Sequence, residues 1–195
     1  NVNAQLFFDD DEIATTGLNK IDIDFQDQTN QFYLQTLIKK DFAFSVGAEH
    51  KRLEIKSETV TTNNNEFVFE NTDYFSVFGS LKLDTYDQKY FPKRGVYFNG
   101  DLHMYLLSSS FNTDFEDFSI AKADLGYAFS LSDKLAFNLR AGGGFKLGDK
   151  STQALDFALG GYGNNLINNF IPFLGYDFIS LVGNSYVKAS FSADY

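Results

Sequence analysis

The stretch KLAFNLRAGGGFKL, residues 134–147, decides the fold, because its side chains alternate in character with a period of two. Successive side chains of a β-strand point to opposite faces, so this segment has one apolar and one polar face. The apolar face carries Leu135, Phe137, Leu139, Ala141, Gly143, Phe145 and Leu147. The polar face carries Lys134, Asn138, Arg140 and Lys146. The pattern predicts a single long strand with two unlike environments.

The same alternation continues outward along the chain. It is strict in FSIAKADLGYAFSL (118–131) and YVKASFSADY (186–195). It holds with few exceptions in KIDIDFQ (20–26), FYLQTLI (32–38), FAFSVGAE (42–49), YFSVFGSLKLD (74–84) and GVYFNGDLHMYL (95–106). Helical periodicity is almost absent, so we expect an all-β chain of about ten strands.

The connections between these strands are unequal in length. KKD (39–41) and SLSDK (130–134) are short, whereas SETVTTNNNEF (57–67) and SSSFNTDFED (108–117) are long and polar. Short turns at one end and long loops at the other are typical of a transmembrane antiparallel β-barrel. A soluble β-sandwich or lipocalin-like barrel also alternates. Lys, Arg and Asp at mid-strand suit a wide, wet lumen better than a dry core, so the membrane barrel is favoured.

The composition narrows the function classes. The net charge of −10 disfavours binding to nucleic-acid phosphates. The chain has no cysteine, which excludes disulfides, thiolate metal sites and a cysteine nucleophile. No run of residues reaches the roughly 18 apolar residues of a transmembrane helix. The start of the chain, NVNAQLFF, has no visible targeting signal.

Candidate catalytic motifs are weak. The G-x-S-x-G motif of serine hydrolases is absent. His103 shares a strand face with Asp101 and Tyr105, but such lumen-facing neighbours usually only bond to one another or to water. The run DDDE (9–12) lacks the spacing of a calcium loop, and AGGGF (141–145) has no helix after it to bind phosphate. We therefore expect no catalytic residue, no metal and no cofactor in this segment.

Two stretches carry a resemblance. In LDTYDQKYFPKRGVYFNGDL (83–102), an aspartate-rich strand end precedes an F-P-x-R-G turn and a new strand. In LGGYGNNLINNFIPFLGYDF (159–178), a glycine pair precedes a long segment with the tip FLGY (173–176). Both resemble the outer-membrane insertase superfamily, of the bacterial surface antigen type, which includes the barrels of BamA, TamA and two-partner-secretion transporters. The family's tip sequence is V-R-G-[FY], so Leu174 occupies its arginine position. From about residue 42 onward, the amino-acid sequence is most similar to the C-terminal barrel of Bacteroidota patatin-like phospholipases.

The resemblance implies structural roles for two sets of residues. The strand-junction motif comprises Asp84, Asp87, Phe91, Pro92, Arg94 and Gly95. The lumen-loop motif comprises Gly160, Gly161, Tyr162, Gly163, Phe173, Leu174, Gly175 and Tyr176. The second motif would fold back into the lumen, which would explain why so long a connection stays apolar. Its glycines would permit tight turns, and its asparagines would satisfy the backbone there.

The resemblance also implies an identity for the whole segment. Residues 1–195 would be a single transmembrane barrel segment, part of a sixteen-stranded barrel and incomplete at both ends. It would sit in the outer membrane of a Gram-negative bacterium and anchor or translocate a lipid acyl hydrolase domain outside this sequence. The alternatives are a BamA/TamA-like insertase or polypeptide transporter, and a small self-contained porin or structural barrel. Expected partners are outer-membrane lipids, the outer-membrane assembly machinery during biogenesis and, as a further option, a second copy in a homodimer, with no nucleic acid.

Overall fold

The protein is described here from a computed structural model. The structure describes residues 2–7, 20–62, 65–109, 115–132, 134–148, 153–162, 169–177 and 180–194. Within them, eight strands form the main sheet. They are β1 (Val2–Phe7), β2 (Lys20–Ile38), β3 (Phe42–Thr62), β4 (Asn65–Asp84), β5 (Gly95–Ser108), β6 (Phe118–Ser132), β7 (Leu135–Gly148) and β11 (Ser185–Asp194).

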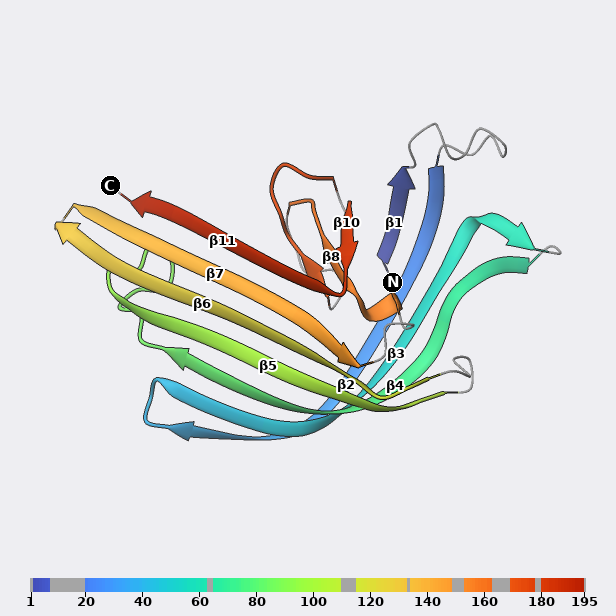
Figure 1. Cartoon of the computed structure of the whole chain (residues 1–195), viewed down its shortest axis with the longest axis horizontal. Coiled ribbons are helices and arrows are strands. Elements are labelled where there is room, and N and C mark those ends of the chain that lie inside the picture. Colours follow the sequence, from blue (N-terminus) through green and yellow to red (C-terminus); the bar gives the residue numbers. More distant parts are fainter. Residues whose placement is uncertain are drawn as a thin grey trace.

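The main sheet is antiparallel throughout and strongly curved (Figure 1). Its order is β1-β2-β3-β4-β5-β6-β7-β11, so every strand pairs with its neighbour in the chain except at the last step. There β11 returns to pair with β7, with Val187 opposite Gly143 and Phe191 opposite Leu139. The edge strands β1 and β11 do not pair with each other in the described residues. The eight strands therefore form an open section of barrel wall, and the prediction of an antiparallel all-β barrel fold is confirmed.

The outer face of this wall is apolar and exposed. On β5, β6, β7 and β11, no position of the outer face carries a charged residue. We call this band the apolar belt. Its exposed members are Phe32, Leu34, Phe44, Val46, Phe75, Val77, Leu81, Val96, Leu102, Met104, Leu106, Leu125, Tyr127, Leu131, Leu139, Phe145, Leu147, Val187 and Phe191. Exposed apolar side chains on a continuous surface of this size match the lipid-facing band of a membrane barrel.

The belt ends on β3 and β4 in a polar cluster on the same outer face. His50 Nε2 lies 3.0 Å from Asp73 Oδ1, and Arg52 Nη1 lies 3.0 Å from Asp73 Oδ2. Arg52 also donates from Nη2 to Asn71 Oδ1 at 3.1 Å. Charged groups on the lipid face are costly near the bilayer centre and cheap at its edge, so this cluster marks the end of the apolar belt. Strands β2, β3 and β4 continue beyond it.

Two sequence predictions were wrong in detail. Residues 57–67 were expected to form a long polar loop, but β3 runs to Thr62 and β4 starts at Asn65, with a register shift between Ser57 and Thr61. Residues 20–26 and 32–38 were expected to be two strands, but β2 is continuous from Lys20 to Ile38. In β2, residues 26–31 are polar on both faces because the strand extends past the apolar belt.

Between β7 and β11, the chain folds onto the inner face of the wall (Figure 1). We call residues 153–183 the inner segment. It contains the 3₁₀ turn η1 (Gln153–Leu155) and a small sheet of β8 (Phe157–Leu159), β9 (Phe170–Ile171) and β10 (Leu181–Gly183). In that sheet β10 pairs antiparallel and β9 parallel with β8. No helix in the described residues is long and apolar enough to cross a bilayer.

The hydrophobic core lies between the inner segment and the wall. Leu155 and Phe157 of the inner segment are buried together with wall residues from five strands. Those wall residues are Leu53, Tyr74, Tyr105, Phe118, Ile120 and Tyr186. Many other inner-face side chains, such as Glu49, Lys51, Asp101 and Lys122, are polar or charged, and this apolar patch provides the docking surface for the inner segment.

Candidate functional site

The inner segment docks through Phe157. This side chain is fully buried, and its ring centroid lies 4.9 Å from that of Tyr186 at an interplanar angle of 66°. The ring covers Gly144 on β7, where an added Cβ would approach Phe157 Cζ to 2.7 Å. The glycine therefore leaves the space that the aromatic ring fills, and β7 and the inner segment pack closely because Gly144 has no side chain.

An ion pair adds a second attachment. Lys146 on β7 places Nζ 3.3 Å from Oδ1 of Asp156, and the Lys146 side chain is only 1% exposed. The same ammonium lies 4.7 Å from the ring centroid of Phe118. A lysine enclosed to this degree requires a compensating charge. Asp156 supplies it from the inner segment, so the pair links the two parts electrostatically.

Hydrogen bonds to backbone carbonyls shape the inner segment itself. Asn169 Nδ2 donates to the carbonyl of Leu155 at 2.5 Å, and the Ala158 amide donates to the carbonyl of Asn169 at 3.1 Å. Gly160 and Gly161 have φ values of 138° and 69°, in the region that favours glycine. The buried amide of Asn169 thus satisfies the backbone at the 3₁₀ turn, one of the roles that the sequence predicts for these asparagines.

The structure brings three members of the lumen-loop motif together, Gly161, Phe173 and Tyr176. The Gly161 amide donates to the carbonyl of Tyr176 at 2.8 Å, and the Phe173 amide donates to the carbonyl of Gly161 at 3.2 Å. The rings of Phe173 and Tyr176 lie 5.5 Å apart. Three other members are open to solvent: Tyr162 is 90% exposed, Leu174 is 73% exposed and an added Cβ at Gly175 would meet nothing within 4 Å. Gly163 lies outside the described residues.

The strand-junction motif forms the connection between β4 and β5. Asp87 Oδ1 accepts hydrogen bonds from the amides of Lys93 at 2.9 Å and Arg94 at 3.2 Å. The backbone bond to Lys93 is the largest cause that lowers the pKa of Asp87 below 3.8. Asp84 Oδ1 accepts in the same way from the amide of Tyr86 at 3.2 Å. Two carboxylates of the motif therefore act as turn caps.

The other motif residues complete this turn. Gly95 has a φ of 120°, and an added Cβ would clash with the carbonyl of Thr85. Pro92 is fully buried, whereas Phe91 is 65% exposed and Arg94 is exposed. The carbonyl of Lys93 accepts a hydrogen bond from Ser130 Oγ at 2.9 Å, which ties the turn to β6. The motif is a rigid junction, and its exposed members face away from the packed part.

A contact that sequence reasoning missed joins this turn to the wall. Tyr86 reaches the inner face, where its hydroxyl occupies the space beside Gly126 that a Cβ would need. Its ring stacks with Tyr97 at 6.0 Å and 17°. Burial is the main cause that raises the pKa of Tyr86 above 10.0. Glycines on a polar strand face, such as Gly126 and Gly144, are the signal that could have indicated aromatic partners.

The inner face carries a charged network, which includes the His103 group singled out from the sequence. His103 Nε2 lies 3.7 Å from Asp101 Oδ2, and Nδ1 lies 3.5 Å from Oε1 of the buried Glu49. Lys122 Nζ lies 3.6 Å from the same Asp101 oxygen, and the His103 ring stacks on Phe78 at 5.1 Å. The imidazole is thus held between two carboxylates across three strands. This arrangement is an ion-pair network of the wall, without the nucleophile–base contact of a catalytic site.

The described residues contain no group of three or more His, Cys, Asp or Glu side chains placed to bind a metal ion. The acidic run at 9–12, considered above as a cation site, lies outside the described residues.

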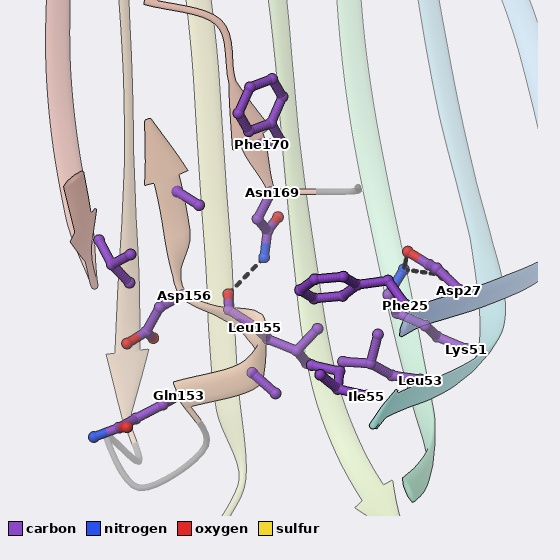
Figure 2. A pocket seen from close by; sticks show the side chains of 13 residues that line it. Phe25, Asp27, Lys51, Leu53, Ile55, Gln153, Leu155, Asp156, Asn169 and Phe170 are labelled. Atoms are coloured by element: carbon purple, nitrogen blue, oxygen red, sulfur yellow. Dashed lines mark hydrogen bonds and ion pairs between the residues drawn. The ribbon is translucent and has the colours of Figure 1, made fainter. Parts of the chain in front are cut away.

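A cavity of about 180 Å³ lies between the inner segment and strands β2 and β3 (Figure 2). Its wall side is formed by Phe25, Leu53 and Ile55. Beside them lies the part-buried pair of Lys51 and Asp27, with Nζ 2.9 Å from Oδ2. Sequence reasoning did not identify this cavity, because it forms only where the inner segment meets the wall.

The comparisons agree with this architecture. The family model described as the OMP85 superfamily matches residues 1–195, the whole of the chain. No curated protein matches the chain.

Proposed function

The chain belongs to the OMP85 superfamily, and we propose that it forms part of the wall of an outer-membrane β-barrel in a Gram-negative bacterium. The observation that carries this proposal is the contrast between the two faces of one sheet. The outer face of β5 to β11 has no charged residue, whereas the inner face holds ion pairs such as Lys146–Asp156. Only an environment with lipid outside and water or protein inside stabilises both faces at once.

Within this barrel, the inner segment acts as a built-in plug. Three successive residues hold it: Leu155 lies in the apolar patch, Asp156 pairs with Lys146, and the ring of Phe157 lies over Gly144. These neighbouring contacts act as one attachment, and all of them must be broken for the segment to leave. A wall that carries its own plug suits an anchor better than an open diffusion pore.

We further propose that the barrel anchors or translocates a patatin-type lipid acyl hydrolase domain. The support is the similarity of the sequence from about residue 42 onward to the barrels of patatin-like phospholipases. Leu174 gives additional support, because an insertase-type tip would place an arginine there. In this chain the tip residue is uncharged and 73% exposed, so it makes no charged contact with the wall.

Labelling of the native outer-membrane protein with a fluorophosphonate tests this assignment, with mass and label read on one gel. A labelled band several-fold heavier than 22.0 kDa is the expected result. A heavy band without label would move the assignment to an insertase or polypeptide transporter. An unlabelled band near 22.0 kDa would leave a small porin or structural barrel and would exclude the hydrolase.

A further inference from the structure

The cavity between the inner segment and β2–β3 has an apolar lining from both sides. The wall contributes Phe25, Leu53 and Ile55, and the inner segment contributes Leu155, Ala158 and Phe170 (Figure 2). Leu53, Leu155 and Phe170 are each at least 97% buried. A half-open space lined mainly by apolar side chains offers few partners for water, because a bound water needs two to four polar contacts.

Each charged side chain at the cavity already has an opposite charge as a partner. Lys51 Nζ donates to both oxygens of Asp27 at 2.9 Å and to Thr29 Oγ1 at 3.1 Å, which uses all three ammonium protons. Asp156 is paired with Lys146. A ligand carboxylate or phosphate would therefore have to displace an existing partner, and a ligand ammonium would meet carboxylates that are already neutralised.

Of the two side-chain amides at the cavity, that of Asn169 is occupied, whereas Gln153 is exposed. Asn169 donates its Nδ2 proton to the carbonyl of Leu155, an interaction drawn in Figure 2. Because the charged groups and this amide already have partners, the surface that remains for a ligand is mainly apolar. The volume of about 180 Å³ is comparable to the roughly 150 Å³ of an apolar protein cavity that accepts a six-carbon ring.

We propose that this cavity binds one uncharged apolar group of about six carbons. Two sources have this chemistry, the end of a membrane acyl chain and a small free hydrocarbon. The site is independent of any attached hydrolase domain, because all its lining residues belong to this chain. Burial of such a group would stabilise the contact between the inner segment and β2–β3.

The chain contains no tryptophan, so a single introduced tryptophan reports on the site without background. Phe25→Trp places it at the cavity, and Tyr162→Trp, at a side chain that is 90% exposed, is the matched control on the inner segment. Both variants of the full chain are refolded into vesicles and checked by the shift of the folded band on an unheated gel. The probe is 6-bromohexanol, whose bromine quenches tryptophan fluorescence on contact.

We expect saturable quenching of the Phe25→Trp protein and only weak linear quenching of the Tyr162→Trp protein. Adding Ala158→Phe to fill the cavity should raise the half-saturation concentration at least about tenfold. If Ala158→Phe does not fold, Val182→Phe fills the same cavity from β10. Linear quenching of both reporters, or saturation that the filled cavity leaves unchanged, would overturn the proposal.

A second arm identifies the source. Vesicles are made from phospholipids brominated near the ends of their acyl chains, with no free probe added. Quenching of the Phe25→Trp protein that Ala158→Phe abolishes would assign the site to acyl chains. If only 6-bromohexanol quenches, the site accepts small free hydrocarbons. If neither does, the cavity binds no apolar group.

Discussion

Phe157 of the inner segment lies over Gly144, whose lack of a side chain leaves the space that the ring fills. Gly144→Ala would place a Cβ 2.7 Å from both Phe157 Cζ and Tyr186 Cε1. We expect this variant to lose about 1–3 kcal/mol, as overpacked interiors do. Gly79→Ala is the control, since its Cβ would lie 3.9 Å from its nearest neighbour. Denaturant unfolding of both variants in vesicles measures the difference in their free energies of unfolding. Equal stability would contradict the close packing of Phe157 on Gly144.

Removing one partner of the Lys146–Asp156 pair should cost more than removing both. Asp156→Asn leaves the enclosed ammonium without this carboxylate, and we expect a loss of roughly 1–3 kcal/mol. This expected loss of stability is smaller than for a fully enclosed pair because Asp156 is 14% exposed. Lys146→Met combined with Asp156→Asn should recover part of the loss. Additive losses in this double-mutant cycle would mean that the two groups do not interact.

The β4–β5 turn should weaken in acid. The pKa of Asp87 is lowered in the folded protein, so its contribution is present above pH 3.8 and disappears as the pH falls through the lowered value. Asp87→Asn removes the charge that the Lys93 and Arg94 amides stabilise. Exchange of these two amides should therefore be faster in the variant at pH 6, with the difference shrinking below pH 3.8. A difference that is constant with pH would contradict a role for the carboxylate charge.

Two glycines with positive φ should respond differently to alanine. Gly95 combines a φ of 120° with a clash against Thr85, whereas Gly175 has a φ of 90° with open space around it. Gly175→Ala should cost about 1 kcal/mol from backbone strain alone. Gly95→Ala should cost more, because the β4–β5 turn must also shift. Thermal shifts of the folded band on a gel compare the two, and a smaller loss for Gly95→Ala would contradict this account.

A charge in the apolar belt should be penalised in proportion to its depth. Leu102→Arg places a guanidinium on the outer face of β5, and we expect a loss of about 2–4 kcal/mol in a bilayer. Gln26→Arg, on the outer face of β2 opposite Glu54, lies beyond the end of the belt. This control should cost little. Equal losses in lipid vesicles would mean that Leu102 does not face lipid.

The faces of the wall were predictable, and the ends of the strands were not. Alternation alone assigns Leu139 to the outer face and Asn138 to the inner face, because the period of two is a property of the strand itself. Alternation fails near Asp27 and Thr61, where β2 and β3 leave the belt and neither face must be apolar. Polar strand and polar loop then look alike in sequence.

The docking of the inner segment was predictable only in outline. Its glycines and asparagines indicate tight, satisfied turns, but nothing local links Phe157 to Gly144 or Asp156 to Lys146. Those contacts depend on how β7 and β11 pair after the segment has folded inward. The cavity beside Leu53 depends on the same docking, so no motif in the sequence indicates it.

The return of β11 to β7 across the inner segment also orders the assembly of the protein. Hairpins such as β6–β7 close after a few residues, whereas pairing of Ser185 with Phe145 must first close the loop formed by residues 146–184. Long loops lose more entropy on closure, so this pairing should form late. Docking of Leu155 and Phe157 shortens this loop, so we expect the inner segment to contact the wall before β11 pairs with β7.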